Sequence, residues 1–398
     1  MRATRVGLGL ILVCAACGRS ADPPSLAVQD SAGVQIVTNF RPAWGEGEAW
    51  TVEDEPLLSI GSVGGDASTL FDRVSSVVPL PSGELAVLDE GAGQIRLFDG
   101  DGRLTRTFGR SGQGPGEFQG LAFVGLTADS LWVFDGRQQR LTVWNPSTGE
   151  FRVAGVGISN AAHGPAGLTS DGTLILVADM GFSEALAADA RDGLQRFSAG
   201  YVSVGSEGVV RDTMLVTDGS ERILVVNPPN IEMIRPLLAR SVSHAVRGSE
   251  LIQGTQADYE FRVYSVDGSL KRLVRRSDVD VALDEASYRA AVDERVLAAP
   301  EPARPGLRRL YEESPRPAYR PAYSKFLVDS EGVLWVQDFS YVGEASSWAV
   351  YDEEGVWLGS LEFPEGFSPT YITADRITGI WRDELGVEYA HVYALERR

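Results

Sequence analysis

The feature that most constrains the fold of this sequence is a unit that recurs along it. An apolar strand ends in an aspartate, a short polar gap and a second strand follow, and a turn of the type D-x-x-G comes next, as in "SGELAVLDEGAGQIRLFDGDGRLTRTFG". The intervals between successive aspartates are 46, 44, 79, 80 and 45 residues. Three of these intervals match one four-stranded blade of a β-propeller, roughly 40–50 residues. The strand-ending aspartates are Asp89, Asp135, Asp179, Asp258, Asp338 and Asp383.

The two long intervals each correspond to one blade plus an insertion. The second contains "VDVALDEASYRAAVDERVLAAPEPARPGLRRLYEESPRP", the one clearly helical stretch of the sequence. Asp284 is the predicted N-cap, and Tyr288, Val292 and Val296 recur on one helical face. The sequence therefore predicts an all-β, six-bladed propeller with a small helical insertion, about residues 278–319, between blades four and five.

The two ends of the chain predict how the ring of blades closes. The last copy, "YITADRITGIWRDELGVEYAHVYALERR", supplies only three strands before the chain stops. Near the start, "AWTVEDEPLLSIGS" has the character of an outer strand without preceding strands of its own. We expect this N-terminal strand to complete the last blade, which leaves no broken sheet edge. The propeller then spans residues 34–398.

The glycine-rich stretch "RTFGRSGQGPGEFQG", residues 106–120, is predicted to be a crossover between two blades. A phosphate-binding loop would be followed by a helix and by the pair Lys-Ser or Lys-Thr. Here a strand follows and the stretch contains no lysine. Its glycines permit the positive φ angles of a sharp turn, and Phe118 is expected to fill the space between the blades.

The segment "IRLFDGDGRLTRTFGRSGQGPGEFQGLAFVGL" resembles the NHL repeat, whose units run strand, D-x-x-G turn, strand and "FG..G.GPGEF". The whole chain resembles bacterial six-bladed propeller lipoproteins of the NHL-like and TolB-like type. The resemblance is sharpest from about residue 71 to residue 126. It implies the fold but not one function, because propellers of this type include binding scaffolds, lactonases, lyases and ligand sensors.

The N-terminus is predicted to be a lipoprotein signal peptide, residues 1–16. Arg2 and Arg5 precede a short apolar run, and Ala15 and Ala16 form a small-residue cleavage site before Cys17. This resembles a bacterial lipobox, so Cys17 is expected to carry the lipid and residues 17–33 to be a flexible tether. Ordinary secretion is the alternative. Glycine rather than aspartate at position 18 favours the outer membrane, facing the periplasm or the surface.

The charge of the chain indicates which partners it does not have. The net charge is −19, and removal of the two signal-peptide arginines makes the exported chain more negative. A strongly acidic chain is a poor binder of nucleic acid or of anionic lipid, so contact with the membrane is expected through the anchor only. We expect a monomer without a cofactor, whose partner is a protein or a small ligand at a propeller face.

Two metal-site hypotheses follow from the resemblance. Lyases of the NHL type bind zinc through histidines, but His163, His244 and His391 are the only histidines, and His391 falls in a third strand. Lactonase-like propellers hold calcium at the axis with carboxylate and amide oxygens. The candidates for such a Ca²⁺ site, in the enzyme alternative only, are Asp72, Glu117 and Asn160.

The favoured hypothesis is a non-catalytic binding module that uses one mouth of the central channel. Aromatic and basic groups in a concave site suit a small acidic or sugar-like ligand. The enzyme alternative is a calcium-dependent lactonase or lyase at the same mouth. The expected ligand-binding residues, taken from the starts of the first strands, are Arg73, Phe118, His163, His244, Tyr323, Lys325 and Tyr371.

Overall fold

The fold is described from a computed structural model of the chain. The structure describes residues 24–127, 129–157, 163–179, 191–227, 230–341, 344 and 346–398. The predicted signal peptide, the lipidation site Cys17 and the calcium candidate Asn160 lie outside the described residues.

The described residues form six sheets, and the predicted all-β class is confirmed. The first sheet is β5 (Val74–Pro79), β6 (Leu85–Asp89), β7 (Gln94–Phe98) and β8 (Leu104–Phe108). The second is β9 (Leu121–Leu126), β10 (Leu131–Asp135), β11 (Arg140–Trp144) and β12 (Phe151–Gly155). The third is β13 (His163–Leu168), β14 (Leu174–Asp179), β15 (Gly193–Val204), β16 (Val210–Asn227) and β17 (Asn230–Ile234).

The remaining sheets incorporate strands from the N-terminus. The fourth is β18 (Ser243–Arg247), β19 (Glu250–Gly254), β20 (Glu260–Ser265) and β21 (Leu270–Arg276), joined by β2 (Val34–Asn39) and β1 (Leu26–Ser31). The fifth is β22 (Tyr323–Val328), β23 (Leu334–Asp338), β24 (Ser347–Tyr351) and β25 (Trp357–Glu362). The sixth is β26 (Phe367–Ile372), β27 (Arg376–Arg382) and β28 (Glu388–Glu396), joined by β3 (Thr51–Val52) and β4 (Leu58–Ile60).

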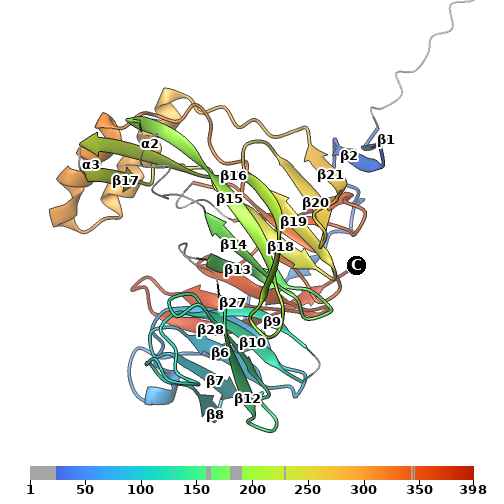
Figure 1. Cartoon of the computed structure of the whole chain (residues 1–398), viewed down its shortest axis with the longest axis vertical. Coiled ribbons are helices and arrows are strands. Elements are labelled where there is room, and N and C mark those ends of the chain that lie inside the picture. Colours follow the sequence, from blue (N-terminus) through green and yellow to red (C-terminus); the bar gives the residue numbers. More distant parts are fainter. Residues whose placement is uncertain are drawn as a thin grey trace, which may run out of the picture.

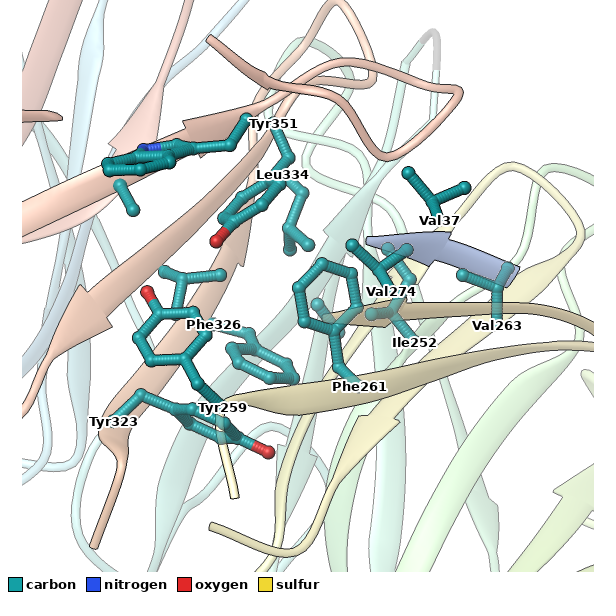
Figure 2. Packing of buried hydrophobic residues seen from close by; sticks show 14 of the residues in the cluster. Val37, Ile252, Tyr259, Phe261, Val263, Val274, Tyr323, Phe326, Leu334 and Tyr351 are labelled. Carbon is teal, nitrogen blue, oxygen red and sulfur yellow. The ribbon is translucent and has the colours of Figure 1, made fainter. Parts of the chain in front are cut away.

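The six sheets surround a common centre. Their first strands contact one another in a closed cycle that runs through β5, β9, β13, β18, β22 and β26 and returns to β5. Neighbouring sheets pack face to face, and the cluster between the fourth and fifth sheets includes Tyr259, Phe261, Tyr323 and Phe326 (Figure 2). The architecture is therefore propeller-like, with its apolar core divided among the spaces between the sheets.

Two of the repeated aspartates, Asp135 and Asp89, end strands and have structural roles in the turns that follow. Asp135, with 1% of its surface exposed, accepts hydrogen bonds from the backbone amides of Gln119, Arg137 and Gln138. Asp89 caps the amide of Ala92 and pairs with Arg96. A buried carboxylate can thus satisfy the amides of the turn that follows each strand.

Two helices lie between β21 and β22, within the range predicted for the insertion. They are α2 (Glu285–Leu297) and α3 (Arg304–Glu313), with a 3₁₀ turn at Glu301–Ala303; a second short 3₁₀ turn is at Ala67–Thr69. Asp284 is the N-cap of α2 and accepts a hydrogen bond from the amide of Ser287, as predicted. Figure 1 shows both helices gathered beside β17, away from the N-terminal hairpin of β1 and β2.

The N-terminal segment runs along the outer edges of three consecutive sheets. β2 pairs in parallel with β21 of the fourth sheet, and the amides of Ala43 and Trp44 donate to carbonyls beside β25 of the fifth. β3 and β4 then pair antiparallel with β28 of the sixth. β1 occupies part of the range 17–33 predicted to be a flexible tether, so regular structure begins earlier in the chain than predicted.

Asn39 joins the fourth and fifth sheets at this edge. Its side chain is 1% exposed. The amide nitrogen donates to the carbonyls of Arg275 and Gly355, at 3.3 and 3.0 Å, and the amide oxygen accepts from the backbone nitrogen of Trp357 at 2.9 Å. One buried side chain thereby satisfies backbone groups of two sheets.

Asn39→Ala is expected to destabilise the protein by about 2–4 kcal/mol, because it leaves buried backbone groups without partners. Urea denaturation followed by circular dichroism measures the change. Gln29→Ala, on the exposed strand β1 of the same hairpin, is the matched control and should change stability by less than about 0.5 kcal/mol. Equal losses from both variants would contradict the bridging role of Asn39.

Candidate functional site

A cavity of about 360 Å³ lies at the centre of the ring, where the first strands end. It is formed by the second halves of β9, β13, β18, β22 and β26, so five sheets contribute to it. We call it the channel cavity. The residues that matter for its chemistry are Phe123, Thr169, His244, Phe326, Thr370 and Tyr371.

Bulges in the first strands shape this cavity. The register shifts between Pro165 and Gly167 in β13, and between Pro369 and Tyr371 in β26. Gly167 has a φ of +154°, and a Cβ there would meet the side chain of Val246 at 2.8 Å. Glycine therefore allows β13 to approach β18 closely, and bulges near the rim of such a ring re-aim the side chains that follow them.

Tyr371 is the main polar group that the cavity offers to a ligand. Its ring contacts that of Phe123 edge to face, with centroids 5.9 Å apart. Burial raises the pKa of the Tyr371 hydroxyl, so it stays protonated at neutral pH. The hydroxyl makes no hydrogen bond to another described residue. The hydroxyl of Thr370, in contrast, is bound to the backbone of Val77 on β5.

His244 lies in the same cavity as an uncharged group. Burial lowers the pKa of its imidazole to about 4. Its Nδ1 is 3.5 Å from the hydroxyl of Tyr201 in the neighbouring sheet. Since no described residue that lines the cavity is an aspartate, glutamate, lysine or arginine, the cavity carries no formal charge at neutral pH. The lining itself is therefore uncharged, and the nearest basic group, Lys325, stands beside it on β22.

Lys325 stands one position before the cavity wall on β22. Its Nζ donates to the carbonyl of Pro369 at 3.1 Å, which ties β22 to β26. Although solvent in the channel can reach this side chain, the surrounding protein desolvates it and lowers the pKa of the ammonium to about 8. Among the described residues Lys325 has no ion-pair partner.

Two of the predicted ligand-binding residues are buried and unavailable to a ligand. Phe118 is 1% exposed and packs between Phe108 and the second sheet, the position expected of a filler between blades. Tyr323 is fully buried, and its hydroxyl donates to the carbonyl of Glu260 and accepts from the amide of Gln256. Phe118 precedes β9, and Tyr323 begins β22. At such positions the sequence alone does not show whether a side chain faces the channel mouth or the core between sheets.

The other predicted residues do not share one mouth. Arg73 is exposed just before β5 and adopts a positive φ of 56°, at the end of the ring opposite the channel cavity. His163 begins β13, and its side chain is outside the described part of the structure. Only His244 and Tyr371 of the predicted set line the channel cavity together. The sequence placed Tyr371 at the start of its strand, but β26 begins at Phe367.

The predicted calcium ligands are not brought together by the described residues. Glu117 is engaged by its own loop, where its carboxylate accepts from the amide of Gly114 and pairs with Arg110. Asp72 is exposed before β5. Within the described ranges there is no group of three or more His, Cys, Asp or Glu side chains placed to hold a metal ion.

A serine–histidine contact that the sequence did not indicate lies in the sixth sheet. Ser59 Oγ is 3.0 Å from His391 Nε2, and His391 Nδ1 is 3.0 Å from the hydroxyl of Tyr393. His391 stacks on Trp381 and is 6% exposed. Burial lowers the pKa of His391 to about 4, which makes it a weak base. Ser59 and His391 are directly opposed on β4 and β28, so the contact is a cross-strand pair that fixes the last sheet.

Comparison with known proteins supports the fold alone. No family model matches the sequence, and no curated protein matches it. A solved structure described as an exported protein from Bacteroides fragilis aligns with a TM-score of 0.50 and 11% identity, over 91% of this chain and 99% of its own. A member of the DUF4221 family from Bacteroides vulgatus also aligns with a TM-score of 0.50 and 11% identity, over 88% of this chain and 99% of its own. Virginiamycin B lyase from Staphylococcus aureus aligns with a TM-score of 0.43 and 8% identity, over 87% of this chain and 99% of its own.

In the described ranges, no helix has the length and apolar character needed to cross a bilayer.

The buried histidines predict that stability falls as the pH is lowered. His391 has a folded-state pKa of about 4 against an ordinary value of 6.5. The folded state therefore binds this proton less tightly than the unfolded state, and the stabilisation is full above pH 6.5 and is lost as the pH falls towards 4. The loss for His391 is at most about 3 kcal/mol, at roughly 1.4 kcal/mol for each pH unit.

The measurement is the free energy of unfolding in urea between pH 7 and pH 4.5, for the natural protein and for His391→Phe. The phenylalanine keeps the stacking on Trp381 but cannot be protonated. The variant is expected to have a shallower pH dependence in this window, although it is less stable at pH 7. The same slope for both proteins would show that His391 does not titrate as its burial implies.

Proposed function

We propose that this protein is an exported six-bladed β-propeller of the NHL-like and TolB-like type, and that its channel cavity binds a small uncharged molecule without converting it. The six sheets represent the blades, and the pairing of β3 and β4 with β28 closes the ring. The observation that carries the binding function is the channel cavity itself, which presents an aromatic pair and a tyrosine hydroxyl that makes no hydrogen bond to another described residue, and whose described lining residues include no acidic or basic side chain.

The chemistry of the cavity favours a sugar-like ligand. Aromatic rings stack against the apolar faces of sugar rings, and a protonated phenol and a neutral imidazole can exchange hydrogen bonds with hydroxyl groups. Phe123 and Tyr371 supply the rings, and Tyr371 and His244 supply the polar atoms. The described lining residues offer no charged side chain to pair with a charged ligand, which favours an uncharged one.

We further propose that the protein is a lipoprotein of the outer membrane. This rests on the sequence: a positive n-region, a short apolar run and the small residues before Cys17. Cys17→Ser is expected to release the protein from the membrane fraction into the soluble fraction of cells that process lipoproteins, as measured by fractionation and immunoblotting. Retention of the variant in the membrane fraction would contradict the anchor.

Binding in the channel cavity is tested by saturation-transfer NMR with phenyl and methyl glycosides as probes. Phe123→Ala and Tyr371→Phe are each expected to weaken binding about tenfold, through loss of the ring contact or of one hydrogen bond to the ligand. Phe151→Ala removes an exposed aromatic from the outer strand β12 and serves as the matched control, with unchanged binding.

The same spectra distinguish binding from catalysis. If none of the glycosides shows saturation transfer, or if Phe151→Ala weakens binding as much as Phe123→Ala, the proposed site is wrong. If the probe, or a lactone supplied with calcium, is consumed by the natural protein, the non-catalytic proposal fails and the enzyme alternative takes its place.

A further inference from the structure

A second cavity, of about 520 Å³, lies at the opposite end of the ring. Its inner wall is the start of β22, with Tyr323 and Ser324, together with Gln256 and Phe339 from the loops beside it. Its outer wall is the helical insertion and the segment between β17 and β18. We call it the helix-side cavity. It shares no lining residue with the channel cavity.

The helix-side cavity presents two arginines that have no partner. Arg235 follows β17 and Arg295 lies on α2, so two separate elements bring them to one space. Both side chains are exposed, and neither makes an ion pair or hydrogen bond with a described residue. Other arginines nearby are paired, as Arg240 is with Glu221 and Arg308 with Asp293.

The absence of acidic groups from this wall is informative because the chain is acidic. The sequence has 55 Asp and Glu against 36 Lys and Arg. None of the described residues that line the helix-side cavity is an Asp or a Glu. Two guanidinium groups therefore face the same space without a counter-charge from its wall. A guanidinium pairs well with a carboxylate or phosphate, often through two parallel hydrogen bonds.

The wall is rigid and strained where it meets the cavity. Leu238 and Gln256 both adopt positive φ angles, 58° and 59°, which are uncommon for residues other than glycine. Gln256 is held there because its amide oxygen accepts from the backbone nitrogen of Ser241, and its amide nitrogen donates to the hydroxyl of Ser243 and the carbonyl of Ser324. Strained residues that are held in place in this way are concentrated at functional sites.

The helical insertion is fixed to this wall by its own apolar cluster. Tyr288, Val292 and Val296 of α2 pack with Tyr311 of α3 and against Leu237 and Leu238. The hydroxyl of Tyr288 also donates to the carbonyl of Tyr311 at 3.3 Å. Since Arg295 is next to Val296 on α2, the same packing fixes the part of the helix that carries Arg295 to the cavity wall.

We propose that the helix-side cavity binds a small organic anion. Its carboxylate or phosphate lies between Arg235 and Arg295, and its apolar part lies against Phe339 and Tyr311. This site differs from the channel cavity in place and in charge, so the molecule has two ligand sites of opposite preference at the two ends of the ring. The inference does not depend on what the channel cavity binds.

Isothermal titration calorimetry of the mature full-length protein tests the proposal with phenylphosphate, phenylacetate and benzyl alcohol. At least one of the two anions is expected to bind and the neutral alcohol is not; which anion binds more tightly identifies the acidic group that the site takes. Arg235→Gln and Arg295→Gln should each weaken anion binding about tenfold, through loss of a charge-assisted hydrogen bond. Both side chains are exposed, so the variants should fold, and a thermal melt verifies this.

Arg289→Gln is the matched control. Arg289 lies on the same helix, pairs with Glu285, and is outside the helix-side cavity. It should leave the affinity within about twofold of the natural protein. If it weakens binding as much as the two cavity variants, the attraction is general and the site is refuted. Failure of both anions to bind, or equal binding of benzyl alcohol, also overturns the proposal, and neither result bears on glycoside binding in the channel cavity.

Discussion

The structure depends on how the first thirty-seven described residues attach to strands from the other end of the chain. β2 extends the fourth sheet, Ala43 and Trp44 bond to the fifth, and β3 and β4 bond to the sixth. Outer strands of a ring of sheets would otherwise be free edges, which invite association with other chains. Asn39 adds a buried side chain that serves two sheets at once. This edge segment therefore links the fourth, fifth and sixth sheets along their outer edges.

The two ends of that central space have different chemistry because different residues reach them. At the ends of the first strands the wall combines aliphatic and hydroxyl side chains with the aromatic rings of Phe123, Phe326 and Tyr371, and burial holds His244 neutral. At the starts of the strands the insertion and the segment after β17 add two arginines that have no ion-pair partner among the described residues. The helical insertion thus changes the charge of the wall at one end of the central space only. A ring of similar sheets can in this way present two unlike surfaces, one built by the repeat itself and one by the sequence inserted into it.

Much of the fold could be predicted from the sequence, since the repeat spacing, the turn aspartates and the helix N-cap at Asp284 all follow local rules. The sites were harder to predict. Phe118 and Tyr323 stand at similar positions to true cavity residues, and only the neighbouring sheets bury them. Tyr371 lines the channel cavity near the end of β26, whereas the sequence placed it at the start of its strand. Arg235 and Arg295 are 60 residues apart in the sequence and meet only because Leu237 and Leu238 pack on α2, which no local pattern indicates.

The pairing of β28 with β3 and β4 also has a consequence for the order of folding. Leu395 of β28 lies opposite Val52 of β3, so a strand near the N-terminus can pair only after the last strand of the chain is present. Contacts this far apart in sequence form slowly, because a long loop must close before they are made. The sixth sheet therefore cannot be completed until β28 is available, and until then β3 and β4 lack the strand with which they pair.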